Sequence, residues 1–141
     1  MAGTEKAIDD YVIAVERIFG KCKMNKNQLT NCGVQYTLTP EHHVELDQDA
    51  YIKTLRPIVH PEPTGASADA KCTKTVTDLF VSLRGALAYT TLTQAWIQVF
   101  IVAAQRVQEP TNLEVRRLNA VTRKLQKGTK ALGLQVHAVL K

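Results

Sequence analysis

The sequence predicts a mostly helical α+β fold, and three features lead to this expectation. Three consecutive stretches in the C-terminal half have helical spacing or helix boundaries. A further amphipathic stretch lies near the N-terminus. Between them is a region rich in β-forming residues and interrupted by a turn. We therefore expect an N-terminal helix, a short β-hairpin and a helix, followed by a linker and a three-helix block.

The first expected helix covers Ala7–Phe19. Its apolar residues recur at helical spacing and define one side, which we expect to be buried: Ile8, Tyr11, Val12, Val15, Ile18 and Phe19. Gly20 follows directly, at the position where many helices end in a left-handed residue. The sequence thus indicates an amphipathic helix with a defined end.

Two strands and a short helix are expected next. Thr30–Leu38 is rich in β-forming residues, and Val44–Leu46 alternates apolar and charged side chains. The turn-prone residues between them predict that the two strands form a hairpin. Asp47 can cap a following helix, which Pro57 would end.

The stretch that begins at His60 is rich in proline, glycine and small residues, a composition typical of exposed linkers. We therefore place an αββα lead-in at residues 1–59, a linker at residues 60–77 and a helical block at residues 78–141.

The helices of this block are expected at Leu79–Thr91, Gln94–Gln108 and Asn112–Lys127. The middle helix is apolar almost all round from Trp96 to Val107, which is typical of a helix buried on every side. Thr111 and Glu114 have the spacing of a capping box at the start of the third helix. Gly128 stands where a left-handed C-cap is expected.

The third helix has an apolar side and a basic side. Leu118, Val121 and Leu125 lie on the side expected to face the core. The remaining surface carries five basic residues: Arg116, Arg117, Arg123, Lys124 and Lys127. Residues 79–141 hold nine Lys and Arg against two Asp and Glu, so this half has a formal charge of +7. Such a surface can bind phosphate backbones, although a solvated helix face or an acidic protein partner would have the same composition.

Composition excludes several classes of protein. At 141 residues the chain is one domain or a part of one, and no apolar run is long enough to span a bilayer. The N-terminus is polar and acidic rather than a secretory signal. Three cysteines without paired spacing favour reduced thiols and an intracellular location, in a compartment that the composition leaves open.

Three ordered blocks resemble the segment after the palm in Ty1/copia-type retrotransposon reverse transcriptases. The matching residues are Ser82, Leu83, Gly85, Leu87 and Tyr89 in the first block, Thr93 and Ile97 in the second, and Arg117, Leu118, Arg123, Leu125 and Gly128 in the third. A Pro-Asp pair of the family is replaced by Ala95 and Trp96. Two earlier motifs, Cys32–Val34 and Leu46–Ile52, extend the resemblance over most of the chain.

The resemblance implies the thumb and connection region of a Pol polyprotein, between the palm and the RNase H domain. The family is an RNA-directed DNA polymerase, but this chain lacks a complete catalytic site. Asp9 and Asp10 resemble the paired catalytic aspartates only superficially, because Ala7 replaces the usual tyrosine and the spacing to the following strand is too short. We expect no catalytic residue among them. Gln48 and Tyr51 stand in the place of the family's primer grip, with a helix cap and a core tyrosine as the alternative reading.

The expected function is therefore non-catalytic, sequence-independent binding of a nucleic-acid duplex, with no metal, no cofactor and no membrane span. The spacings of Cys22, Cys32, His42 and His43 fit none of the usual zinc patterns. A co-opted structural or interaction subunit is the main alternative, with the apolar Ile97–Val107 helix as its docking element. A chain without a function is the third.

Overall fold

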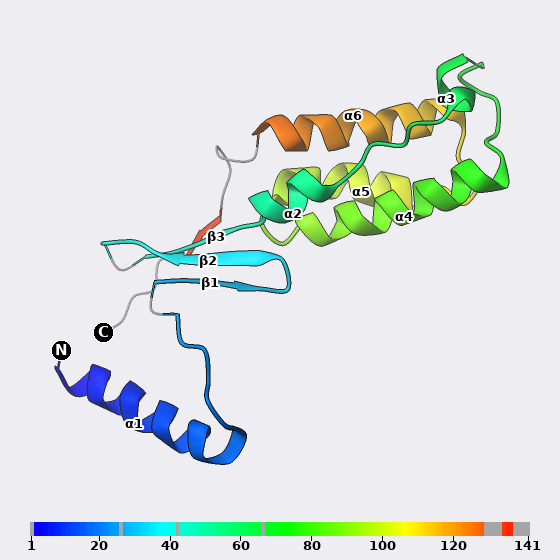
Figure 1. The fold of residues 1–141 in the computed structure, drawn as a ribbon. Coiled ribbons are helices and arrows are strands. Elements are labelled where there is room, and N and C mark those ends of the chain that lie inside the picture. The colour runs from blue at the N-terminus through cyan, green and yellow to red at the C-terminus, as the bar shows by residue number, and fades with distance from the viewer. Residues whose placement is uncertain (1, 26, 42, 66, 129–133, 137–141) are drawn as a thin grey trace.

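The structure is a computed structural model that describes residues 2–25, 27–41, 43–65, 67–128 and 134–136 (Figure 1). In chain order its elements are α1 (Ala2–Phe19), β1 (Gln28–Asn31), β2 (Val34–Leu38), β3 (Val44–Asp47), α2 (Asp49–Thr54), α3 (Pro61–Gly65), α4 (Lys74–Thr90), the 3-10 helix η1 (Ala95–Ile97), α5 (Gln98–Gln105), α6 (Asn112–Gly128) and β4 (Leu134–Val136). The fold is α+β and mostly helical, which confirms the class expected from the sequence.

The strands form one antiparallel sheet in the order β1-β2-β3-β4. β2 and β3 form the expected hairpin, with Tyr36 opposite Leu46. The single strand predicted at Thr30–Leu38 is wrong, because the chain turns back at Cys32 and Gly33. Both residues have positive φ, 49° and 76°, as the two-residue turn of a tight hairpin requires. The sheet therefore has more strands than the sequence indicated.

The hydrophobic core lies among α2, α4, α5 and α6 rather than under the sheet (Figure 1). Its fully buried residues include Ile52 of α2, Phe80 and Leu87 of α4, Ile101 of α5 and Leu125 of α6. α4 and α6 contribute buried side chains at spacings of three, four or seven residues, so one face of each points inward, whereas α2 and α5 contribute Ile52 and Ile101. The N-terminal half thus supplies a short helix to a core that the C-terminal half mostly builds.

The ends of α6 differ from each other in how well the sequence predicts them. At the start, the Glu114 carboxylate accepts a hydrogen bond from the Thr111 backbone N–H at 2.7 Å, as a capping box requires. At the end, Gly128 lies within the helix and does not have the positive φ expected of a left-handed cap. Glycine is permitted that conformation but not obliged to adopt it, so this part of the prediction is wrong.

The helix predicted at Gln94–Gln108 forms as η1 followed by α5, but it is not buried on every side. Ile97 and Ile101 are buried, whereas Val99 is 74 % exposed and Phe100 48 % exposed. α4 and α6 cover only one side of α5, which leaves the rest of its apolar surface in solvent. Among the described residues, no helix combines the length and the apolarity that crossing a membrane would need.

The helix predicted at Ala7–Phe19 is confirmed and begins earlier, at Ala2. Gly20 ends it with φ 85°, and its N–H bonds the Glu16 carbonyl. The burial of its apolar side is wrong: Ile18 and Phe19 are 75 % and 79 % exposed. α1 lies apart from α4, α5 and α6, with the sheet between them (Figure 1).

The stretch from residue 60 to residue 77, expected to be an exposed linker, is instead built into the helical block. It contains α3, whose Pro63 is buried, and the first turn of α4, whose Val76 is buried. α3 packs against α6, and the Cys72 N–H bonds the Pro110 carbonyl. Helix α4 begins at Lys74, five residues earlier than predicted.

Candidate nucleic-acid interface

Helix α6 presents the five predicted basic residues on the side that faces away from the core. Leu118 and Leu125 are buried on its inner side, as the spacing predicted, together with Val115; Val121, also predicted there, is half-buried at the edge. All five basic residues are exposed: Arg116, Arg117, Arg123, Lys124 and Lys127. Because α6 is anchored by its buried side, these cations extend from a fixed backbone rather than from a loop.

The basic residues divide into two flanks. Arg116, Arg123 and Lys127 occupy the flank toward α3, and the Arg116 Nε donates to the Pro63 carbonyl at 2.5 Å. Arg117 and Lys124 occupy the flank toward α5. The Lys124 ammonium lies 5.2 Å from the centroid of the Trp96 ring, which is a cation–π distance. Arg116 therefore has a structural contact, which the spacing did not indicate.

Polar side chains along one edge of α6, beside its buried side, form hydrogen bonds with the backbone of the segment from residue 52 to residue 67. Gln126 donates to the Leu55 carbonyl at 2.8 Å, and Asn112 donates to the Ser67 carbonyl at 3.0 Å. Asn119 makes two bonds, donating to the Ile58 carbonyl at 2.8 Å and accepting from the Ile58 N–H at 2.7 Å. Together with Arg116, these four residues form what we call the α6 backbone clamp.

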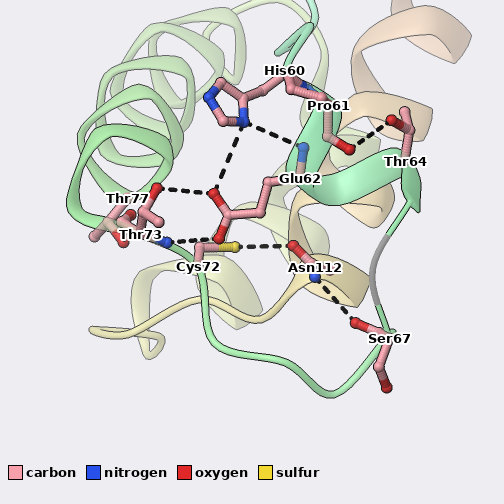
Figure 2. A network of polar contacts seen from close by, with 9 residues as sticks. All are labelled: His60, Pro61, Glu62, Thr64, Ser67, Cys72, Thr73, Thr77 and Asn112. Atoms are coloured by element: carbon pink, nitrogen blue, oxygen red, sulfur yellow. Dashed lines mark hydrogen bonds and ion pairs between the residues drawn. The ribbon is translucent and has the colours of Figure 1, made fainter.

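The carboxylate of Glu62 fixes the start of α4 (Figure 2). It accepts one hydrogen bond from the Thr73 backbone N–H and one from the Thr73 hydroxyl, each at 2.8 Å. Thr73 is the N-cap of α4, so a negative charge stands at the positive end of the helix dipole. This contact between residues eleven positions apart explains why α4 begins before the periodic apolar residues do.

The same network contains a cysteine, a histidine and an asparagine, residue types found in nucleophilic active sites (Figure 2). Here the Cys72 thiol donates to the Asn112 side-chain oxygen at 3.4 Å, while His60 contacts Glu62. Burial, together with the charges of Glu62 and Glu114, raises the pKa of the Cys72 thiol. A raised pKa disfavours the thiolate, which is the nucleophilic form, and the hydrogen bond to Asn112 gives Cys72 a structural contact with α6.

This difference predicts the order in which the thiols react. Cys22 and Cys32 are exposed, whereas Cys72 is half-buried and its raised pKa reduces the thiolate fraction. With iodoacetamide near neutral pH, Cys72 should react roughly tenfold more slowly than the other two, and its pH–rate midpoint should lie above that of an ordinary thiol. Mass spectrometry of timed digests measures this, and the three rates should converge in denaturant. Preferential labelling of Cys72 in the folded chain would contradict the assignment.

Gln48 and Tyr51 connect the sheet to the helical block. Gln48 is 1 % exposed, its Nε2 donates to the Tyr89 carbonyl at 3.4 Å, and its Oε1 accepts from the Thr93 hydroxyl at 2.8 Å. The half-buried Tyr51 donates to the Ala86 carbonyl at 3.2 Å. The polar atoms of both residues are therefore used inside the chain, in line with the alternative of structural roles.

The paired acidic residues are also far from a catalytic arrangement. Asp9 and Asp10 lie in the middle of α1, both exposed, and adjacent residues of a helix point about 100° apart. Across the described part of the chain, no group of three or more His, Cys, Asp and Glu side chains could hold a metal ion. His42, one of the four metal candidates considered from sequence, lies outside the described residues.

No protein-family model, curated protein or solved structure matches the chain. The contacts of the chain's own residues therefore carry the functional argument.

Proposed function

We propose that the chain binds nucleic-acid duplexes through the exposed basic side of α6, independently of base sequence. The observation that carries this proposal is the exposure of all five basic residues on one helix whose opposite side is buried. Residues 116 to 127 span about 16 Å of helix, over which one strand presents about five phosphates. Arginine and lysine contacts to phosphate hold a duplex without reading its bases.

The proposal includes an origin for this surface. The residue matches in α4, around η1 and in α6 support a thumb- or connection-like element of a Ty1/copia reverse transcriptase, which would grip a primer–template duplex without performing chemistry. The structural roles of Gln48 and Tyr51 leave α6 as the part of this element that can contact nucleic acid. The three free cysteines support an intracellular location.

Duplex binding should depend strongly on salt. If four or five cations contact phosphates, the logarithm of the association constant should fall against the logarithm of salt concentration with a slope of about −3 to −5. Fluorescence anisotropy of a labelled duplex at several salt concentrations measures the slope. Replacing Arg123 and Lys127 together by Gln should flatten it by about 2 and weaken binding equally for unrelated sequences.

The matched control is the Lys21→Gln, Lys23→Gln variant, which removes the same charge from the exposed connection between α1 and β1. It should leave the slope nearly unchanged. Arg116 is left intact because replacing it would also remove its bond to the Pro63 carbonyl. If the wild-type chain has no measurable affinity for duplex at low salt, the proposal is wrong.

A second candidate function is protein–protein interaction, and the exposure of α5 favours it. Val99, Phe100 and Val102 are 74 %, 48 % and 38 % exposed and lie on one short helix. Contiguous exposed apolar patches, rather than single apolar side chains, mark interaction surfaces. The apolar residues of this α5 surface are not among the five basic residues proposed to bind duplex.

A further inference from the structure

Two apolar surfaces of the chain lack a partner within the described residues, and the first is a groove between α5 and α6. Phe100, Arg117 and Val121 line two adjoining hollows of about 130 Å³ and 330 Å³. The larger one also reaches Trp96 and Lys124. The floor of this α5–α6 groove is apolar, and its α6 rim carries Arg117 and Lys124, with Glu114 at the smaller hollow.

The second surface is the apolar stripe of α1. At 100° per residue its six apolar side chains fall within an arc of about 120°: Ile8, Tyr11, Val12, Val15, Ile18 and Phe19. Four of them are more than half exposed: Ile8, Tyr11, Ile18 and Phe19. A helix with such a stripe is normally stabilised by packing it against another element, which the chain's own helical block does not provide here.

The charges beside the two surfaces are complementary and have the same spacing. Asp9 and Glu16 lie seven residues apart along one edge of the α1 stripe, so their backbones are separated by about 10.5 Å. Arg117 and Lys124 also lie seven residues apart, along the α6 rim of the groove. An α1 helix lying in the groove could therefore place each carboxylate beside one cation.

The other edge of the stripe fits the other wall of the groove. Ala7 and Ala14 form that edge, and they too are seven residues apart. Small side chains there allow a close approach to Phe100 and Ala103, which line the α5 side of the groove. Shape and charge thus point to the same placement, with the acidic edge toward α6 and the alanine edge toward α5.

From this match we infer that α1 of a second copy of the chain docks in the α5–α6 groove, and that a reciprocal exchange closes a homodimer. The inference rests on the interaction function proposed above and gives it a specific partner. The exchange buries the α1 stripe and the exposed Phe100 of α5 in one step, and a two-fold arrangement uses both grooves.

The oligomeric state in the absence of nucleic acid tests this inference. Sedimentation over a concentration series should show the mass rising from 15.6 kDa toward twice that value. Ile18→Gln combined with Phe19→Gln should weaken dimerisation roughly tenfold or more, because both side chains would be buried only in the dimer. Ile13→Gln is the matched control: Ile13 is 51 % exposed on the opposite side of α1 and should change nothing.

Charge exchange tests the register. Arg117→Glu with Lys124→Glu should weaken the dimer about tenfold, and so should Asp9→Lys with Glu16→Lys; the four changes together should restore it. A wild-type chain that stays monomeric, a dimer indifferent to Ile18 and Phe19, or charge reversals that do not rescue each other would each overturn the inference. If the chain is a monomer and the α1 stripe contributes to its stability, the chain's own α1 fills the groove. That result would also overturn the inference. Arg117 and Lys124 belong to both proposals, but Arg123 and Lys127 line neither hollow, so duplex binding through those two residues would survive all of these outcomes.

Discussion

Replacing Phe80 by alanine is expected to lower the free energy of unfolding by about 3–5 kcal/mol, the usual range for deleting a buried phenyl ring. Phe80 is 1 % exposed and stands where α4 meets α5 and α6. It also lines the smaller hollow of the α5–α6 groove, about 130 Å³, so truncation would deepen that hollow into the core. The Arg84 guanidinium, 5.9 Å from the ring centroid, would also lose its aromatic neighbour.

Chemical denaturation followed by circular dichroism measures this loss. The matched control is Leu79→Ala, one residue earlier on the same helix, where the side chain is 42 % exposed. We expect that variant to cost about 1 kcal/mol or less. If Phe80→Ala and Leu79→Ala lowered the free energy of unfolding equally, the side of α4 that carries Phe80 would not be the one that faces the core.

Replacing Asn119 by alanine is expected to cost about 2–5 kcal/mol. Its side chain makes hydrogen bonds with both the N–H and the carbonyl of Ile58, a buried residue. Alanine would leave two backbone groups without a partner in the interior, and each unsatisfied group costs roughly 1–3 kcal/mol. Loss of these two hydrogen bonds should also increase the mobility of the segment between α2 and α3.

Hydrogen exchange at the Ile58 amide reports that local effect, and denaturation reports the global one. Arg123→Ala, on the exposed side of the same helix, is the control and should change stability by about 0.5 kcal/mol or less. If the Asn119→Ala chain retained both its stability and the protection of the Ile58 amide, Asn119 would not stabilise the segment as the α6 backbone clamp requires.

The elements that the sequence predicted well are those whose signals are local. Helix α6 has a 3.6-residue apolar period and the Glu114 half of a capping box, and both appear in the structure because they depend on residues within one turn of each other. The exposure of its basic residues follows from the same period. Gly20 is predictable for the same reason, since its N–H bonds a carbonyl only four residues earlier.

The elements that the sequence predicted poorly depend on what lies opposite them. The uniform apolarity of α5 has no period from which its covered side could be read. The stripe of α1 shows that one side suits burial, but not which surface buries it. The polar anchors were missed because their partners are distant: Asn119 and Ile58 are 61 residues apart, and Gln48 and Thr93 are 45 apart.

The sequence-based prediction missed the β1–β2 hairpin turn for another reason. Cys32-Gly33 supplies the two positive φ angles of the turn, but cysteine is not among the residues that usually mark such turns. The glycine was a usable signal, because a side chain there would be strained by φ 76°. An early turn would have split the predicted strand into β1 and β2.

The α6 backbone clamp has a consequence for how the chain can change over evolutionary time. Its four side chains bind main-chain groups, and every amino acid supplies a carbonyl, so the clamp is indifferent to most side chains of the segment that it holds. That segment can therefore drift in sequence wherever its own side chains are exposed. We expect the clamp residues to be conserved instead, because their side-chain amides and guanidinium group form the hydrogen bonds. Divergent copies of this fold should be recognisable by the spacing of polar residues along one helix, even where the segment beside it has become unalignable.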